Sequence, residues 1–339
     1  MTRAPTTVQV LWIGGVRFLI STSRPIAMVP PDRPYPLFRR PPSSAAAPAM
    51  DVRVRLELDA FPKLLARERV FESGEAWSLY RRGNSRFLLQ TPHGGAAPGW
   101  CARFSSGRRS VVVYCAPGMW QARARGARLW NPMTYPLDLV LVMYLLAGGA
   151  GVVIHGAGVE IAGRGYVFAG RSGAGKSTIS RQFLRSRNAR VLSDDRVVVR
   201  VTPRGLELCG TPWLGTAAVS RNRTCPLAGF FFLRHGSKNQ ATPITAAAGM
   251  EALLPVVSIP WFDRDMVAPM LALVDRMAAE VPMFDLSFRP TPAIARDLSG
   301  WVRGAGAPGC SRSAFAATCC SSYGPRKSSR IPRGLLLRL

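Results

Sequence analysis

The nine residues from Gly170 to Thr178 constrain this chain more than any other stretch. They read GRSGAGKST and match the pattern G-x-x-x-x-G-K-[ST], whose glycine-rich backbone surrounds phosphate oxygens with N–H groups. Residues 165–169 before them are mostly apolar and suit a strand, and residues 179–187 after them contain no Gly or Pro and can be helical. A strand, this loop and a helix are the context that the motif needs, so the sequence predicts a P-loop that binds a nucleotide.

The motif positions predict how the phosphates would be held. Glycines permit a tight loop whose N–H groups point inward, and the helix that follows adds the positive end of its dipole. Lys176 can reach the β- and γ-phosphates, and the hydroxyl of Ser177 can bind Mg²⁺. We therefore expect ATP and Mg²⁺ as cofactors, with the nucleotide bound by Gly170, Ser172, Gly173, Ala174, Gly175, Lys176, Ser177 and Thr178.

Two adjacent acids follow the next expected strand. Residues 189–192 suit a strand, and Asp194 and Asp195 come just after it. Strand ends of such sheets lie beside the phosphate site. Mg²⁺ needs a carboxylate, and a kinase needs a second one to orient or deprotonate the acceptor hydroxyl. The alternative is a solvated turn with two acids.

His155, the predicted P-loop and the double Asp occur in an order that resembles the HPr serine kinase/phosphorylase family. The shared elements are Ile154-His155-Gly156, the Gly170–Ser177 motif and Val191-Leu192-Ser193-Asp194-Asp195, over roughly residues 150–200. The resemblance implies an α/β fold, α+β overall, related to ATP-utilising phosphoenolpyruvate carboxykinases.

The same resemblance assigns roles to residues. It implies that Asp194 is the acid/base acting on a Ser hydroxyl, that Asp195 and Ser177 lie at the metal, and that His155 supports the acidic pair. Lys176 would neutralise charge during transfer. Glu207 matches the Glu of the family's Glu-x-Arg-Gly signature and is a further candidate metal ligand, although Cys209 replaces the Arg and Thr178 stands where the family has Glu.

The rest of the chain predicts four regions. Residues 1–49 contain an apolar run broken by Arg17 and then many prolines, so we expect a disordered or non-native tail, with Met50 as the natural start. Residues 50–130 predict a small, mainly β lobe, with strands at 52–58, 77–80, 86–89 and 110–115. Residues 131–300 predict the kinase domain, and residues 301–339 a disordered C-terminal tail.

In the kinase domain, residues 137–147 predict a buried helix and 152–154 a buried strand. Further strands are expected at 197–201 and 206–208, which form a hairpin, and at 230–233. Residues 246–255 and 267–280 suit helices.

Charge and composition leave several functions open. The net charge is +26, but it is almost all arginine and is spread along the chain, which argues against a nucleic-acid interface. No C-x-x-C pair is present, and we expect a cytoplasmic protein without a membrane segment. The favoured function is transfer of the ATP γ-phosphate to a hydroxyl of a protein or peptide. A nucleotide-binding switch without transfer and a small-molecule kinase remain alternatives, and the resemblance suggests a homo-oligomer.

Overall fold

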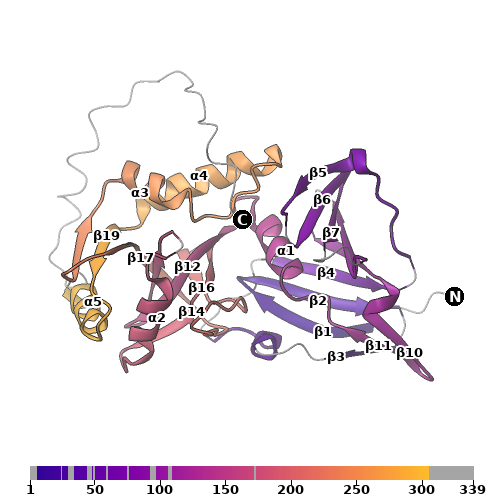
Figure 1. Cartoon of the computed structure of the whole chain (residues 1–339), viewed down its shortest axis with the longest axis horizontal. Helices are drawn as coiled ribbons and strands as arrows, with labels where there is room; N and C mark the ends of the chain where they lie inside the picture. Colours follow the sequence, from indigo (N-terminus) through magenta and orange to yellow (C-terminus); the bar gives the residue numbers. More distant parts are fainter. Residues whose placement is uncertain are drawn as a thin grey trace, which may run out of the picture.

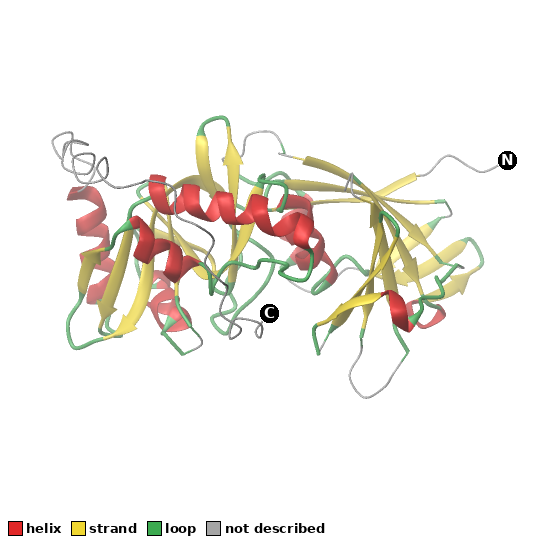
Figure 2. Cartoon of the chain, turned by 90° about the horizontal axis from the view of Figure 1, so that it is seen from above, coloured by secondary structure: helices red, strands yellow, loops and turns green. Residues whose placement is uncertain are grey.

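The protein is a mixed α/β molecule with two halves, seen side by side in the computed structural model (Figure 1). The structure describes residues 6–304 except 24, 30–33, 44–47, 49, 59, 75, 92–96, 106–108 and 172. Strands dominate one half, whereas the helices gather in the other and along the seam between them (Figure 2). The tail predicted after residue 300 falls mostly on residues 305–339, which lie outside the described part of the chain.

An eight-stranded sheet forms most of the N-terminal half among the described residues. Its spatial order is β1-β2-β4-β9-β8-β7-β6-β5, and a three-stranded sheet of order β10-β11-β3 lies beside it. The strands predicted at 52–58, 77–80, 86–89 and 110–115 are confirmed as β4, β6, β7 and β9. The bounds are β1 Thr6–Ile13, β2 Val16–Thr22, β3 Ile26–Val29, β4 Met50–Glu57, β5 Arg69–Glu72, β6 Trp77–Arg82, β7 Ser85–Gln90, β8 Trp100–Ser105, β9 Ser110–Cys115, β10 Trp120–Arg123 and β11 Gly126–Trp130.

The tail predicted for residues 1–49 is wrong for their described part. β1 and β2 form a hairpin around Gly14 and Gly15, which both have positive φ, as such tight turns require. Arg17 does not break this hairpin, because burial alternates along β2 and Arg17 lies on its open face, paired with Asp51 of β4. The segment buries seven apolar side chains: Leu11, Ile13, Val16, Phe18, Ile20, Tyr35 and Phe38.

The C-terminal half is a second sheet with helices on both faces. Its described strands follow the order β13-β12-β15-β16-β17-β19-β18, β14 pairs with β12, and β13 also pairs with β17, which closes part of the path. α2 and α5 pack in one core cluster, and α3 and α4 in another. The bounds are β12 Gly151–Ile161, β13 Arg164–Ala169, β14 Ala189–Ser193, β15 Arg196–Thr202, β16 Gly205–Cys209, β17 Thr224–His235, β18 Gln240–Pro243, β19 Met283–Phe288, α2 Lys176–Leu184, α3 Ala246–Leu253, α4 Arg264–Glu280 and α5 Ala293–Gly304.

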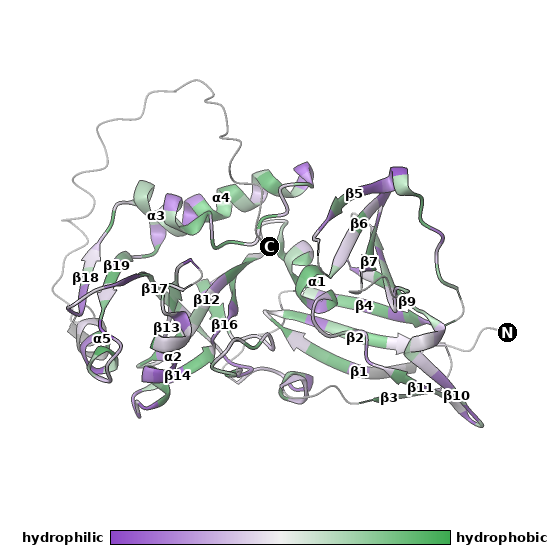
Figure 3. Ribbon diagram, in the orientation of Figure 1, coloured by the Kyte–Doolittle hydropathy of each residue, from purple (hydrophilic) through white to green (hydrophobic). Residues whose placement is uncertain are grey.

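The expected helices and strands of this half are confirmed. The seam between the halves adds side-chain contacts that the sequence did not predict. α1 (Leu137–Leu146) is almost entirely hydrophobic (Figure 3) and is buried between the halves. Within the described residues, no helix has both the length and the hydropathy that crossing a membrane requires. Across the seam, Arg86 of β7 forms a buried ion pair with Asp263, and Phe71 stacks on Phe262 with ring centroids 4.0 Å apart.

The buried carboxylate of Asp138 connects the N-terminal segment around Tyr35 to the C-terminal half. The η1 turn (Tyr35–Arg39) carries Tyr35, whose hydroxyl donates to Asp138 of α1 at 2.9 Å. The indole of Trp213 donates to the same carboxylate at 3.0 Å. Burial raises the pKa of Asp138 to about 6, although these hydrogen bonds act to lower it. Residues 34–43 are therefore part of the folded structure.

Candidate functional site

The glycine-rich loop, residues 170–175, joins β13 to α2 in the strand–loop–helix order that the sequence predicts. Gly175 caps the N-terminus of α2 with φ of 99°, in the left-handed region. A Cβ at this position would also come within 2.7 Å of the ring of Phe288. Only glycine fits there, and it leaves the first N–H groups of α2 facing the loop without partners inside the helix.

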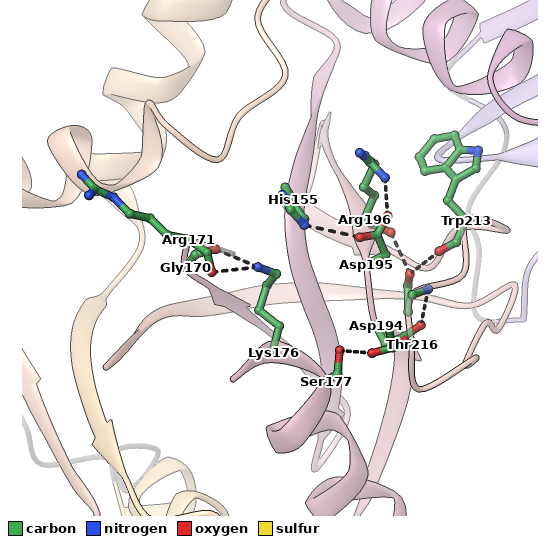
Figure 4. Close-up of polar contacts among 12 residues, drawn as sticks. His155, Gly170, Arg171, Lys176, Ser177, Asp194, Asp195, Arg196, Trp213 and Thr216 are labelled. Carbon is green, nitrogen blue, oxygen red and sulfur yellow. Dashed lines mark hydrogen bonds and ion pairs between the residues drawn. The ribbon is translucent and has the colours of Figure 1, made fainter. Parts of the chain in front are cut away.

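Lys176 is the first residue of α2, and its side chain turns back over the loop. Its ammonium group donates to the backbone oxygens of Gly170 at 2.9 Å and Arg171 at 3.2 Å (Figure 4). Burial lowers the pKa of Lys176, and the nearby charge of Asp195 opposes that effect without cancelling it. From the other side, Nε2 of His235 donates to the oxygen of Gly173 at 2.8 Å. The loop is thus held by its own lysine and by a histidine from β17.

Asp195 directly precedes β15 and contacts two side chains, His155 and Arg196. Its carboxylate is 3.3 Å from Nε2 of His155 and forms an ion pair with Arg196, and its side chain is 21% exposed. Burial acts to raise the pKa of Asp195. The hydrogen bond from His155 and the charges of Arg196 and Lys176 outweigh burial, and the net pKa lies below its usual value. Asp195 is therefore an ionised carboxylate within the electrostatic reach of Lys176.

Asp194 has different surroundings, although it is the neighbour of Asp195. It is 2% exposed and accepts three backbone hydrogen bonds: from Gly215 at 3.0 Å, Ala217 at 2.6 Å and Val219 at 3.2 Å. These bonds anchor residues 215–219, which we call the anchored loop. Thr216 is the second residue of this loop, and its hydroxyl donates to the hydroxyl of Ser177 at 2.6 Å (Figure 4). Asp194 thus positions the group that contacts Ser177.

The structure brings together five of the expected site side chains and separates one. Around the glycine-rich loop and the start of β15 lie Lys176, Ser177, Asp194, Asp195 and His155 (Figure 4). Glu207 instead pairs with Arg200, with Nε–Oε2 of 2.8 Å. Arg200 is four residues along β15 from Arg196, a separation of about 13 Å in a strand. Glu207 is therefore not beside the loop.

The remaining loop positions add little side-chain chemistry. Ser172 lies outside the described residues, and Thr178 is half-buried on the first turn of α2. Gly170, Gly173 and Ala174 contribute backbone groups. Sequence reasoning missed Thr216 and His235, because each comes from a segment with no motif of its own. Arg196 could have been noticed, since it directly follows the two acids.

Comparisons with known proteins add only distant structural likenesses. No family model matches the chain, and no curated protein matches it. Among solved structures, the HPr(Ser) kinase/phosphatase from Coxiella burnetii matches with 11% sequence identity and a TM-score of 0.28, over 45% of this chain and 95% of that one. A likeness this remote leaves the function to be argued from the side chains of the site itself.

Proposed function

We propose that this protein is an ATP-dependent kinase that transfers the γ-phosphate to a hydroxyl group, with Ser of a protein or peptide as the expected acceptor. The observation that carries the proposal is the position of Lys176, whose ammonium group contacts the backbone oxygens of the glycine-rich loop while the carboxylate of Asp195 is close enough for each charge to shift the pKa of the other. A cation that reaches phosphates and a carboxylate on the same side are the two charges that phosphoryl transfer requires.

The proposal assigns the catalytic carboxylate to Asp195 and a positioning role to Asp194, the reverse of the sequence-based expectation. Both oxygens of Asp194 already accept backbone N–H groups, so a proton or an acceptor hydroxyl would have to displace a bond of the anchored loop. Asp195 is partly exposed and has side-chain partners that can move. The family resemblance implies that Asp195 lies at the metal. One carboxylate can bind the metal and also orient the acceptor hydroxyl.

In the proposed reaction, the acceptor oxygen forms a bond to the γ-phosphorus while the bond from phosphorus to the β–γ bridging oxygen breaks. The bridging electron pair leaves on ADP, and the hydroxyl proton passes to Asp195. A low carboxylate pKa suits this step, because the loose transition state of phosphoryl transfer needs orientation of the hydroxyl more than a strong base. Lys176 would balance the charge that develops on the phosphate oxygens.

Mg²⁺ fits the groups around Ser177. The ion prefers one or two carboxylates, a hydroxyl, phosphate oxygens and water to a cage made entirely of protein. Over the described part of the chain, no cluster of three or more His, Cys, Asp or Glu side chains could form such a cage. Ser177 and Asp195 would hold the ion, and when bound it would neutralise charge on the β- and γ-phosphates.

A labelling experiment tests the proposal. The purified protein is incubated with a cell extract, Mg²⁺ and ATP labelled in its γ-phosphate, and the labelled products are separated by size and identified. We expect a labelled protein or peptide with the wild type and none with Lys176→Ala, which loses the phosphate-binding cation. Tight nucleotide binding without any labelled acceptor would instead indicate a switch, and a small labelled compound would indicate a small-molecule kinase.

A further inference from the structure

A cavity of about 100 Å³ lies in the seam between the two halves. Its buried lining is apolar and includes Trp77 of β6, Val140 and Met143 of α1, and Val257. The more exposed lining is largely polar and includes Tyr135, which is 54% exposed, and the side chains of His155 and Arg196. The cavity therefore has an apolar floor and a mostly polar mouth, the arrangement that binds a group with one apolar end and one polar end.

The mouth of this cavity adjoins the proposed catalytic carboxylate. His155 and Arg196, which line the cavity, are also the two side chains that pair with Asp195. The ammonium group of Lys176 contacts the glycine-rich loop and is near enough to Asp195 for its charge to act on that carboxylate. Asp195 therefore lies between the proposed nucleotide site and the cavity. A hydroxyl group at the cavity mouth would be next to the Asp195 carboxylate.

The size of the cavity limits what can enter it. A cavity of about 150 Å³ is large enough for benzene, so about 100 Å³ accommodates an aliphatic side chain but not an indole. Ser73 and Ala76, which follow the edge strand β5, form part of the wall. β5 ends the order of the described N-terminal sheet and exposes 45% of Val70. An outer strand can pair with an extended peptide, whose side chain would then reach the cavity.

We propose that this cavity selects the phosphate acceptor by binding an aliphatic side chain next to the acceptor Ser. The inference rests on the proposed kinase function and adds a substrate class to it. Peptides with Val or Leu beside the Ser are the preferred acceptors, because these side chains fill the floor formed by Trp77, Val140 and Met143. Trp is too large for the cavity, and Asp would leave its charge desolvated against apolar groups.

The test measures binding separately from transfer. Fluorescent Ser peptides with Ala, Val, Leu, Trp or Asp beside the Ser are titrated into the protein with Mg²⁺ and a non-hydrolysable ATP analogue, and anisotropy gives each Kd. We expect Val and Leu peptides to bind at least about tenfold more tightly than Trp and Asp peptides, which corresponds to about 1.4 kcal/mol. Ala76→Leu fills the cavity from the N-terminal half and is expected to remove this preference.

Two further variants keep the result interpretable. Ala122→Leu makes the same change at an exposed position of β10 and is expected to leave every Kd unchanged. Val140→Ala enlarges the floor and is expected to shift the preference toward a larger neighbour such as Phe. Equal affinities for all five peptides in the wild type, or unchanged affinities in Ala76→Leu, would overturn the inference.

Parallel assays separate this inference from the proposed function. Transfer of labelled phosphate is measured with the same peptides, and binding of free 3-methylbutan-1-ol is measured by calorimetry. Selective peptide binding without transfer would count against the kinase and support the cavity, whereas transfer without selectivity would do the reverse. If the protein binds the alcohol but none of the peptides, and Ala76→Leu abolishes alcohol binding, the peptide proposal would be wrong. The cavity would then bind the aliphatic part of a small acceptor alcohol.

Discussion

Replacing Asp194 by Asn should release the anchored loop and not merely remove a charge. Oδ1 accepts from Gly215 and Val219, and Oδ2 accepts from Ala217 at 2.6 Å. The single amide oxygen of Asn can keep the first two bonds, but its NH₂ group then faces the N–H of Ala217. A lost bond to a charged group costs about 1.5–3 kcal/mol, and a buried donor without a partner costs about 1–3 kcal/mol more.

Burying a neutral amide costs less than burying a carboxylate, which offsets part of this loss. We therefore expect the free energy of opening the anchored loop to fall by about 2–4 kcal/mol. The matching assay is hydrogen exchange of the anchored loop by mass spectrometry, in which exchange should accelerate roughly 30- to 900-fold. Asp195→Asn is the matched control, because this neighbouring carboxylate accepts from side chains and its loss should leave exchange of the anchored loop near the wild-type rate. Wild-type exchange in Asp194→Asn, together with lost transfer and intact nucleotide binding, would refute the anchoring role and return the catalytic carboxylate to Asp194.

Three other changes give measurable outcomes. A chain that begins at Met50 should not fold cooperatively in urea, because burial of each lost side chain such as Phe18 or Phe38 contributes about 1.5–3 kcal/mol; a two-state transition like that of the full chain would contradict this. Asp138 binds its proton more tightly when folded, so its contribution to stability is complete below its ordinary pKa of 3.8 and is lost as pH rises through about 6. Between pH 4 and 7 the free energy of unfolding of the wild type should therefore fall by about 2 kcal/mol relative to that of Asp138→Asn, and a constant difference would be inconsistent with the raised pKa. Gly215→Ala should lower the melting temperature and speed exchange of the anchored loop, since a Cβ would meet Oδ2 of Asp194 at 2.8 Å, and an unchanged melting temperature would show that the loop has room.

The elements around the site could be predicted because each carries a local signal. The strand before Gly170 and the buried helix α1 follow from apolar runs bounded by Gly or Pro, and the helix after Gly175 follows from a stretch that contains neither residue. The proximity of His155, Lys176 and Asp195 followed from the order of three segments. Their roles, the nucleotide and the metal stay predictions.

The tail predicted for residues 1–49 is wrong in their described part for an identifiable physical reason. Arg17 interrupts an apolar run in the sequence, but Val16, Phe18 and Ile20 alternate with polar or half-exposed positions as a strand requires. The partner that makes Arg17 favourable, Asp51, lies 34 residues later in the chain. Pairing at that distance leaves no local signal.

The difference between Asp194 and Asp195 could not be predicted either. Two adjacent residues at a strand end point in different directions, and what each meets depends on segments far along the chain. Asp194 meets the anchored loop, about 20 residues later, and Asp195 meets His155, 40 residues earlier. The contact between Thr216 and Ser177 depends on the same packing.

The most direct test of the central claim is the transfer rate of Asp195→Asn. The acceptor identified by labelling is used with ATP and Mg²⁺, nucleotide binding is measured on the same sample, and Lys176→Ala is included as the variant without the phosphate-binding cation. We predict that Asp195→Asn binds ATP within a few-fold of the wild type and transfers phosphate about 10²- to 10⁴-fold more slowly. A transfer rate equal to that of the wild type would contradict the assignment of Asp195 as the catalytic carboxylate.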